Sequence, residues 1–301
     1  MNCRVLRYSQ NTILRYRRLK ICATILSQRA WRESRCQNLR CGRVVRPEPG
    51  TSFVVDSTGE FVLHATVQRS VVFITGTDTG IGKTVLAVLL LRYLRSMGAA
   101  AAGLKPVCSG GRSDARALAA AMGGMLALDE INPWHFRATL APLLAARREK
   151  RTLSLAQVVD HVRRLQRRFP VLLIEGAGGL LSPLGEDFDS RDLITALSAH
   201  PIVVCPNRLG AVNQALLVLA ALPARLSRRA HVVLTTPERS DPAARSNPDL
   251  LRERLGRDRV HVLPRISTGR LHEMLRRRRV RSTLDALARQ IGAEPPPGGS
   301  A

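Results

Sequence analysis

Short, continuous apolar runs recur along the chain from residue 71 onward, and helix-forming stretches separate them. The runs do not alternate apolar with polar positions, so neither face of such a strand is suited to water. Strands of this kind are typical of a parallel sheet that has helices on both sides. The runs are 71–75, 100–107, 171–174, 202–205, 231–234 and 260–263. We therefore predict an α/β fold with a mostly parallel sheet and helices on both faces.

Amphipathic or alanine-rich stretches between these runs predict the helices. The clearest stripe is 155–168, where apolar residues recur at helical spacing. We expect helices over 83–96, 114–125, 155–168, 192–198, 212–222 and 249–255, and a loop over 128–136. Ligands of such sheets bind beyond the carboxyl ends of the strands. The loops that follow residues 75, 105, 174, 205 and 234 should therefore line one crevice.

Both ends of the chain lack this pattern. Residues 1–50 hold twelve Lys and Arg against two acidic residues and show no sustained periodicity. We expect residues 1–70 to be a basic leader, either disordered or a spurious extension, although an organellar transit peptide has a similar composition. Residues 71–266 should form the working domain. Residues 267–301 should form a basic helix-like segment over 271–287 and a disordered Pro/Gly tail.

The formal net charge of +24 is high enough to suggest a nucleic-acid partner. An arginine-rich coding bias is the favoured explanation, because Arg far outnumbers Lys; in addition, aromatic residues make up only 4% of the chain and do not interleave with the basic ones, as they would in a nucleic-acid site. We therefore expect no specific nucleic-acid partner. No apolar run reaches the ~20 residues of a membrane span, so we expect no membrane partner and a cytoplasmic location. The six cysteines include no C-x-x-C pair, which leaves a zinc site without support.

The sequence from Gly76 to Thr84 reads Gly-Thr-Asp-Thr-Gly-Ile-Gly-Lys-Thr and lies between an apolar run and a predicted helix. Strand, glycine loop, Lys-Thr and helix is the layout of a phosphate-binding P-loop. Its backbone N–H groups and the helix N-terminus bind the anion, Lys83 reaches the outer phosphates, and the Thr84 hydroxyl holds Mg²⁺. Five residues separate Gly76 from Gly82, one more than in the commonest form. The pattern predicts a P-loop NTPase-like domain that binds ATP.

Charged residues follow two other apolar runs. Lys105 ends one run and can neutralise a transferring phosphoryl group, although a surface lysine would look the same. Glu175 ends another, before Gly176-Ala177-Gly178-Gly179, and its carboxylate can hold Mg²⁺. Asp114 is a second candidate metal ligand, or simply an acidic residue at a helix start. Gly210 and Asn213 open a predicted helix whose N-terminus would suit a carboxylate, or they form a plain helix-opening turn.

These motifs together resemble the dethiobiotin synthetase family. The resemblance covers residues 71–266 and includes Lys105-Pro106-Val107 with Ser109-Gly110, Asn132-Pro133-Trp134-His135-Phe136, and Leu209-Gly210 with Asn213. It implies an ATP-dependent cyclo-ligase of biotin biosynthesis that acts as a homodimer. The implied substrates are 7,8-diaminononanoate, carbon dioxide and ATP, with Mg²⁺ as cofactor. The diamine is carboxylated to a carbamate, ATP phosphorylates the carbamate, and the second amine closes the cyclic urea.

The resemblance also implies a role for individual residues. Lys83, Lys105 and Thr79 are implied to be catalytic; Ser109, Thr79, Gly210 and Asn213 to bind the substrate; and Thr84, Asp114 and Glu175 to serve the metal. The implied ATP-binding residues are Gly80, Ile81, Gly82, Lys83, Thr84, Val85, Asp114, Glu175, Gly176, Ala177, Gly178, Thr235 and Thr236. The helix opening at Gly210 is implied to receive the substrate carboxylate across the dimer interface.

The chain departs from the family pattern at three places. The segment from Ser109 to Asp114 is short, Thr235-Thr236 replaces the family's adenine-reading Asn-Asp, and neither the leader nor the basic tail has a counterpart. The alternative interpretation is a P-loop ATPase switch of the partition or cluster-carrier type. Those switches carry a lysine early in the loop, where this chain has Thr77 and Asp78.

Overall fold

The computed structural model describes residues 51–55, 61–65, 69–237, 241–266 and 271–292. The expected leader up to residue 50 and the expected Pro/Gly tail from residue 293 lie outside these residues. The chain divides into two compact units, Met1–Val67 and Gln68–Ala301. In the first unit, β1 (Thr51–Val55) and β2 (Phe61–Ala65) pair antiparallel. All other described elements belong to the second unit.

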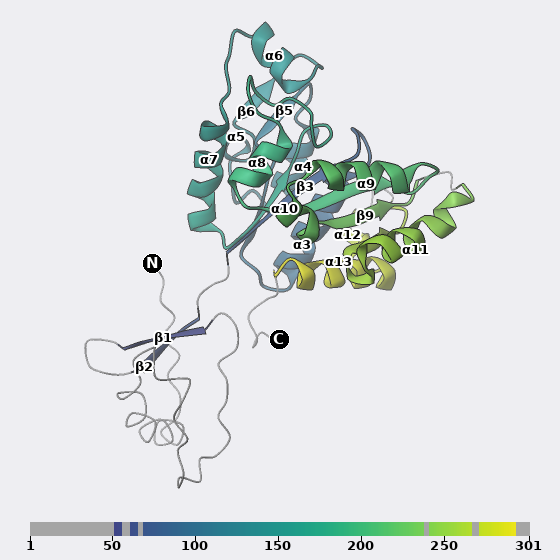
Figure 1. Cartoon of the computed structure of the whole chain (residues 1–301). Coiled ribbons are helices and arrows are strands. Elements are labelled where there is room, and N and C mark those ends of the chain that lie inside the picture. The colour runs from purple at the N-terminus through teal and green to yellow at the C-terminus, as the bar shows by residue number, and fades with distance from the viewer. Residues whose placement is uncertain (1–50, 56–60, 66–68, 238–240, 267–270, 293–301) are drawn as a thin grey trace, which may run out of the picture. The chain divides into compact units, whose positions relative to one another are not determined.

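A six-stranded parallel sheet forms the centre of the second unit (Figure 1), and its strand order is β10-β9-β8-β3-β7-β4. All five pairings between neighbouring strands are parallel. The strands are β3 (Ser70–Gly76), β4 (Ala101–Leu104), β7 (Val171–Glu175), β8 (His200–Pro206), β9 (His231–Thr235) and β10 (Val260–Leu263). Their residues are almost all buried, which confirms the predicted α/β architecture.

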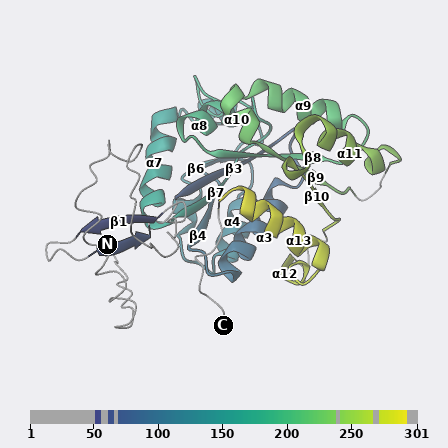
Figure 2. The ribbon, with the colours of Figure 1, turned by 60° about the horizontal axis from the view of Figure 1, so that its bottom comes forward.

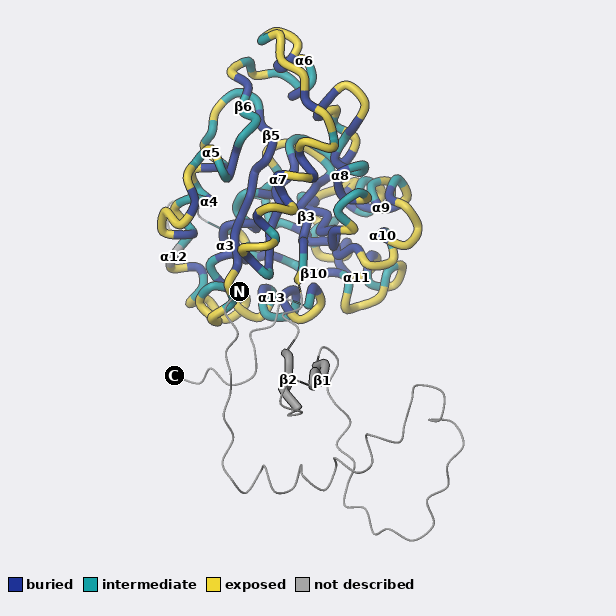
Figure 3. The backbone as a smooth tube through the Cα atoms, turned by 90° about the vertical axis from the view of Figure 1, so that its left-hand side faces the viewer, coloured by how far each residue is buried: buried dark blue, intermediate teal, exposed yellow. Residues whose placement is uncertain are grey.

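Helices cover both faces of this sheet (Figure 2). One face carries α3 (Lys83–Ser96), α4 (Ser113–Ala121), α12 (Leu271–Met274) and α13 (Arg278–Gln290). The other carries α7 (Leu155–Arg168), α8 (Ser190–Ala196), α9 (Ala211–Ala221), α10 (Ala224–Arg229) and α11 (Ala243–Leu255). The buried residues form a continuous band along the sheet between the two helix layers, and the exposed ones lie on the outside (Figure 3).

A second, small sheet begins where the sequence predicted a single strand over 100–107. The chain leaves the main sheet at Lys105-Pro106, and β5 (Val107–Ser109) then pairs parallel with β6 (Trp134–Phe136). Pro106 has no N–H to continue a ladder, which explains the break. The expected loop over 128–136 contains β6 and a one-turn helix, α5 (Leu128–Ile131), and α6 (Pro142–Arg148) was not predicted.

The basic segment after residue 266 is two helices, α12 and α13, where the sequence predicted one helix-like stretch over 271–287. Three apolar residues of α13, Val280, Leu284 and Leu287, are fully buried. The helix is also tied to its neighbours by polar contacts, including a 2.8 Å hydrogen bond from the Tyr93 hydroxyl of α3 to Asp285. A boundary at residue 266 stays a prediction, and this packing argues for counting α13 with the domain.

Across the described residues, no helix combines the length and the apolar character that crossing a bilayer requires.

Candidate functional site

The loop between β3 and α3 has the backbone of a phosphate cradle. Gly80 and Gly82 adopt φ values of 73° and 99°, in the left-handed region that favours glycine. The N–H of Thr77 donates to the carbonyl of Val204 on the neighbouring strand at 3.0 Å, which fixes the start of the loop. Helix α3 then begins at Lys83, and no side chain caps its first N–H groups. These groups are therefore free to bind an anion.

Lys83 is buried at the end of this loop, with a relative exposure of 5%. Its ammonium donates to the backbone carbonyl of Asp78 at 2.5 Å. Burial, followed by the nearby positive charge of Lys105, lowers the pKa of Lys83 to about 8. A carbonyl compensates a buried cation only in part, so a phosphate at the loop would supply the missing counter-charge.

Lys105 and Glu175 meet at the carboxyl ends of β4 and β7. The Lys105 ammonium lies 2.7 Å from Glu175 Oε1 and 2.9 Å from Asp114 Oδ2, and it donates to the carbonyl of Gly176 at 3.1 Å. The Thr84 hydroxyl donates to the same Glu175 oxygen at 2.7 Å. The structure thus brings together one cation, two carboxylates and the P-loop hydroxyl.

Charge pairing dominates the protonation of this group. Burial acts to lower the pKa of Lys105, but Glu175 and Asp114 outweigh it and raise the pKa above its usual value. Burial acts to raise the pKa of Asp114, but Lys105 outweighs it and holds the pKa below its usual value. Lys105 is therefore a permanent cation and Asp114 a permanent anion near neutral pH. Lys105 is not the surface lysine that the sequence also allowed, because it is 4% exposed.

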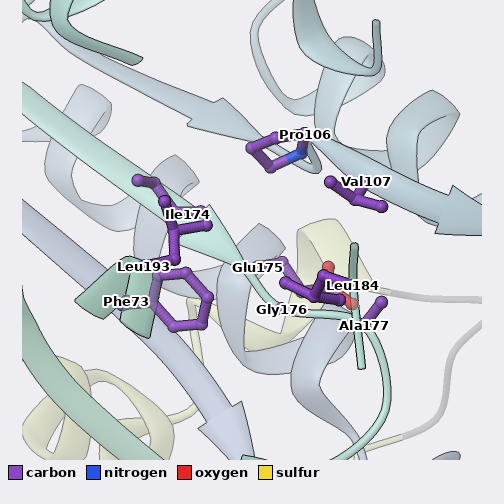
Figure 4. A pocket seen from close by; sticks show the side chains of 9 residues that line it. All are labelled: Phe73, Pro106, Val107, Ile174, Glu175, Gly176, Ala177, Leu184 and Leu193. Atoms are coloured by element: carbon purple, nitrogen blue, oxygen red, sulfur yellow. The ribbon is translucent and has the colours of Figure 1, made fainter. Parts of the chain in front are cut away.

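Glu175 keeps one carboxylate oxygen for which the structure shows no partner. Its Oε2 is buried and makes no hydrogen bond with any part of the chain that the structure describes. The side chain borders a small cavity of about 10 Å³, walled mainly by apolar residues that include Pro106, Val107 and Leu184 (Figure 4). An orphaned carboxylate oxygen is costly and is the kind of atom that a cation or a water satisfies.

The donors present fit Mg²⁺. Thr84, Asp114 and Glu175 offer hard oxygen ligands, and Asp114 stays half-open to solvent with 41% of its side chain exposed. The described part of the chain holds no cluster of three or more His, Cys, Asp or Glu side chains suited to a metal. Mg²⁺ is usually bound by one or two carboxylates together with waters and phosphates, so this set is sufficient for it.

The two threonines that follow β9 use their hydroxyls on backbone carbonyls. The Thr235 hydroxyl donates to the P-loop carbonyl of Ile81 at 3.0 Å, and the Thr236 hydroxyl donates to Leu263 at 3.0 Å. A Cβ at Gly82 would lie 3.3 Å from the Thr235 methyl, so Thr235 packs directly against the loop. Thr235 therefore stabilises the P-loop by a hydrogen bond to Ile81 and by packing against Gly82.

The glycines after Glu175 allow close packing. A Cβ at Gly176 would lie 2.9 Å from the Phe73 ring, and one at Gly178 would lie 2.3 Å from Ser182 Oγ. Gly178 also has a positive φ of 68°. A side chain at Gly176 would collide with the Phe73 ring of β3, and one at Gly178 with Ser182; of the P-loop, only Thr79 Oγ1 lies within reach of a Cβ at Gly178, at 4.0 Å.

The remaining predicted residues lie outside the charged group. Thr79 is exposed at the loop tip, where its N–H is held by Asp78 at 2.6 Å, and Val85 follows Thr84 in α3. The Ser109 hydroxyl donates to the carbonyl of Leu140. Gly210 precedes α9 with φ 87°, and Asn213 is exposed on its first turn. Within the described residues, Ser109, Gly210 and Asn213 make no hydrogen bond or ion pair with Lys83, Lys105, Asp114 or Glu175.

Sequence reasoning gave no role to two polar residues beside this group. Asn132 was noted only as part of a motif, and Arg112 was not noted at all. In the structure Asn132 donates to the carbonyl of Lys105 at 2.7 Å, and Arg112 donates to Asn132 Oδ1 at 3.0 Å. The only signal in the sequence was the short segment between Ser109 and Asp114, which places Arg112 near the start of α4.

Comparisons with known proteins agree with this geometry. Residues 70–269 match the family described as an AAA domain. The chain is 42% identical over 198 residues to the ATP-dependent dethiobiotin synthetase BioD of Anaeromyxobacter dehalogenans (strain 2CP-C), covering 64% of this chain and 88% of the relative. The chain belongs to the ATP-dependent dethiobiotin synthetase family. It is therefore an enzyme of the ligase class.

Other relatives of the same name are similarly close. The BioD of Xylella fastidiosa (strain Temecula1) is 37% identical over 205 residues, which cover 65% of this chain and 91% of that protein. Among solved structures, the MinD cell division protein of Aquifex aeolicus matches 74% of this chain and 97% of its own at 13% identity, with a TM-score of 0.49. That value is too low to support an argument, and family membership rests on the sequence relatives.

Proposed function

We propose that this protein is a dethiobiotin synthetase that carboxylates 7,8-diaminononanoate with carbon dioxide and closes the cyclic urea at the expense of ATP. The observation that carries the proposal is the second buried lysine. Lys105 stands at the end of β4, is held by Glu175 and Asp114, and is close enough to Lys83 to lower its pKa. Two cations beside one phosphate cradle suit a reaction in which two anionic reactants meet.

Each step of the proposed reaction places negative charge where these side chains lie. One amine attacks carbon dioxide and gives a carbamate; the carbamate oxygen displaces ADP from the γ-phosphorus; the second amine displaces phosphate and closes the ring. Lys83 and the loop N–H groups would bind the phosphates. Lys105 would face the carbamate and the transferring phosphoryl group. Thr79 and Ser109 would contact the diamine or the carbamate.

Mg²⁺ would be held by Thr84, Asp114 and Glu175, and when bound it would supply charge neutralisation to the phosphates of ATP. The orphaned Glu175 Oε2 supports this assignment. Thr84 and Lys105 share the other oxygen of the same carboxylate. The carboxylate thus connects the proposed metal site to the proposed carbamate site.

The substrate carboxylate would bind at the N-terminus of α9, between Gly210 and Asn213, in a homodimer. Two exposed leucines support a partner surface there: Leu209, 76% exposed, and Leu217, 61% exposed, are the most exposed large apolar side chains among the described residues. The alternative, a nucleotide switch without a small-molecule substrate, has no better support. It leaves the buried Lys105 without a reacting partner.

The variant Lys105→Gln distinguishes the ring-closing enzyme from the nucleotide switch. The proposal predicts that formation of the cyclic product from diaminononanoate, bicarbonate and ATP falls about 30- to 1000-fold, because Lys105 serves a charge that exists only when all three are bound. Affinity for ATP should change little, because the P-loop contacts are intact. Both quantities are measured on the same folded preparation. A small, equal effect on both, or a wild-type protein that makes no product, would favour the switch.

A further inference from the structure

Asn132 is a buried amide whose hydrogen-bonding groups are all occupied. It is 1% exposed. Its Nδ2 donates to the carbonyl of Lys105 at 2.7 Å, with a longer contact to the carbonyl of Pro106 at 3.5 Å. Its Oδ1 accepts from Arg112 Nε at 3.0 Å and from the Cys108 thiol at 3.2 Å. A buried amide this fully satisfied holds a single orientation.

Arg112 connects the same amide to the start of α4. Besides Asn132 Oδ1, it donates to three acceptors in α5 and the residue that follows it: the carbonyl of Leu128 at 3.1 Å, Asp129 Oδ1 at 2.8 Å, and the carbonyl of Asn132 at 2.9 Å. Its side chain is 18% exposed. Because Arg112 directly precedes α4, the guanidinium fixes where this helix begins. Asp114 is the second residue of the helix.

These contacts close into a ring around one lysine. The Lys105 carbonyl is bound by Asn132, Asn132 by Arg112, and Arg112 leads through Ser113 to Asp114. Asp114 Oδ2 then returns to the Lys105 ammonium at 2.9 Å. The Lys105 N–H adds a 3.0 Å hydrogen bond to the carbonyl of Ile131 in α5. The backbone and the side chain of Lys105 are thus held by one connected set of groups.

We propose that Asn132 and Arg112, called the clasp below, are positioning residues that hold Lys105 and Asp114 in register for the reaction. The inference rests on the proposed function. Neither residue is placed to touch the reactants; both act through Lys105 and Asp114. Their role follows from where Lys105 stands, at the point where the chain leaves the main sheet and Pro106 ends the ladder. The strand hydrogen bonds stop there, and the clasp replaces them.

The size of the expected effect follows from positioning. Moving a reacting charge by about 1 Å can cost on the order of 10² in rate. Loss of the clasp should therefore lower kcat substantially. The affinity for ATP measured without Mg²⁺ should be spared, because neither clasp residue contacts the P-loop and only the metal involves Asp114.

The primary test replaces Arg112, which is partly exposed and so easier to remove than Asn132. Arg112→Ala should lower kcat for product formation about 10- to 100-fold and change the Kd for ATP, measured without Mg²⁺, less than about threefold. Arg112→Lys should recover part of the rate, because an ammonium can bind some of the same acceptors. Asp129→Asn is the matched control: it weakens only the exposed partner of Arg112 and should leave kcat near wild type.

A double variant tests whether the two residues act as one unit. Arg112→Ala combined with Asn132→Ala should lose little more activity than the worse single variant. Independent losses that multiply would overturn the clasp. So would Arg112→Ala with wild-type kcat, a loss of ATP affinity in proportion to kcat, or an Asp129→Asn effect as large as that of Arg112→Ala. If Arg112→Ala does not fold, Arg112→Lys carries the test with a smaller expected loss.

A measurement independent of activity separates this inference from the proposed function. Hydrogen exchange in the peptide spanning residues 104–109 should become faster in Arg112→Ala, while exchange in the P-loop stays as in wild type. Unchanged exchange in 104–109 would overturn the clasp. A wild-type protein that makes no cyclic product would overturn the proposed function. The exchange measurement would then still show whether the clasp holds residues 104–109 in place.

Discussion

The central sheet buries polar side chains in opposite ways at the two ends of its strands, called below the carboxyl edge, where the parallel strands end, and the amino edge, where they begin. At the carboxyl edge, Lys83, Lys105 and Glu175 are between 1% and 5% exposed, and Lys105 is held as a cation by its carboxylate neighbours. At the amino edge, His200 and His231 begin β8 and β9, His261 is the second residue of β10, and all three are between 4% and 8% exposed. One edge preserves charge inside the protein, and the other suppresses it.

The three histidines form a ladder across neighbouring strands. The rings of His200 and His231 stack with centroids 5.1 Å apart, and His231 Nδ1 lies 3.2 Å from His261 Nε2. Burial lowers the pKa of His200 to about 4, of His231 to about 3 and of His261 to about 4. Nearby Arg229, Arg252 and Arg259 act in the same direction, and Asp258 opposes them at His231 and His261.

The difference shows what each edge is built to receive. A buried cation is tolerated when a carboxylate is present or an anionic ligand arrives, as at the loops beyond β3, β4 and β7. Among the described residues no carboxylate forms an ion pair with a ring at the histidine edge, and burial outweighs the pull of Asp258, so the rings stay neutral and pack as flat polar groups. We expect changes at the carboxyl edge to alter chemistry, and changes at the amino edge to alter how stability depends on pH.

The largest effect is expected from Lys83→Ala. Removing one preorganised donor at a transferring charge typically costs about 10²–10³ in rate. The free energy of unfolding should not fall, because within the described residues the buried ammonium has only the Asp78 carbonyl as a hydrogen-bond partner, and its pKa is already lowered. Steady-state kinetics and urea unfolding of the same variant check both parts. A rate within threefold of wild type would remove the P-loop assignment.

Lowering the pH should protonate the histidines of the amino edge and so destabilise the folded protein. The histidine pKa values in the folded protein lie at about 3 to 4, below the usual value of 6.5. Below pH 6.5 these histidines are therefore protonated in the unfolded chain but remain neutral in the folded protein. The stability that these residues contribute is complete above about pH 6.5 and is lost as the pH falls toward about 4. Near pH 5, three such groups give a slope of at most about 4 kcal/mol per pH unit.

Replacing one ring isolates this contribution. His231→Gln should reduce the slope of unfolding free energy against pH by up to about 1.4 kcal/mol per pH unit between pH 6 and 5. Urea unfolding at several pH values measures the slope, and all other titrating groups are common to both proteins. Product formation at pH 7.5 should change little, because the ladder is at the far edge from the site. An unaltered slope would mean that the ladder takes up no protons on unfolding.

The pattern of adjacent residues was sufficient to predict the parallel strands and the P-loop. Continuous apolar runs predicted the parallel strands, and the Gly-rich loop before Lys83-Thr84 predicted the P-loop, because both signals are contained in a few adjacent residues. The break at Lys105-Pro106 and the pairing of β5 with β6 were missed. A three-residue strand carries almost no pattern of its own, and its partner lies 27 positions away in the sequence.

The candidate site was predictable as a set of residues but not as a network. The sequence placed Lys105 and Glu175 at strand ends, and parallel pairing brought both to one edge. It did not show that Asp114 binds Lys105 directly or that Arg112 reaches Asn132, since both contacts depend on where α4 begins. Thr235 was expected at the nucleotide, whereas its hydroxyl in the structure binds a P-loop carbonyl.

The smallest expected effect concerns Thr235, where two neighbouring threonines provide their own control. Thr235→Val keeps the shape and the methyl that packs on Gly82 but removes the hydrogen bond to Ile81. A net hydrogen bond is worth about 1 kcal/mol, or roughly a fivefold change in an equilibrium constant. We expect the Kd for ATP to rise about fivefold, because the loop would no longer be held in its binding shape. Thr235→Ser should restore most of the affinity.

Thr236→Val removes a hydroxyl of the same kind, whose acceptor is Leu263 at the end of β10 and not the loop. It should lower stability by a similar amount and leave ATP affinity unchanged. Isothermal titration with ATP, paired with urea unfolding, distinguishes the two positions. Equal affinity losses at both would mean that the two hydroxyls contact the nucleotide itself, as first expected from the sequence. Equal stability losses with no change in affinity would mean that the loop keeps its shape without Thr235.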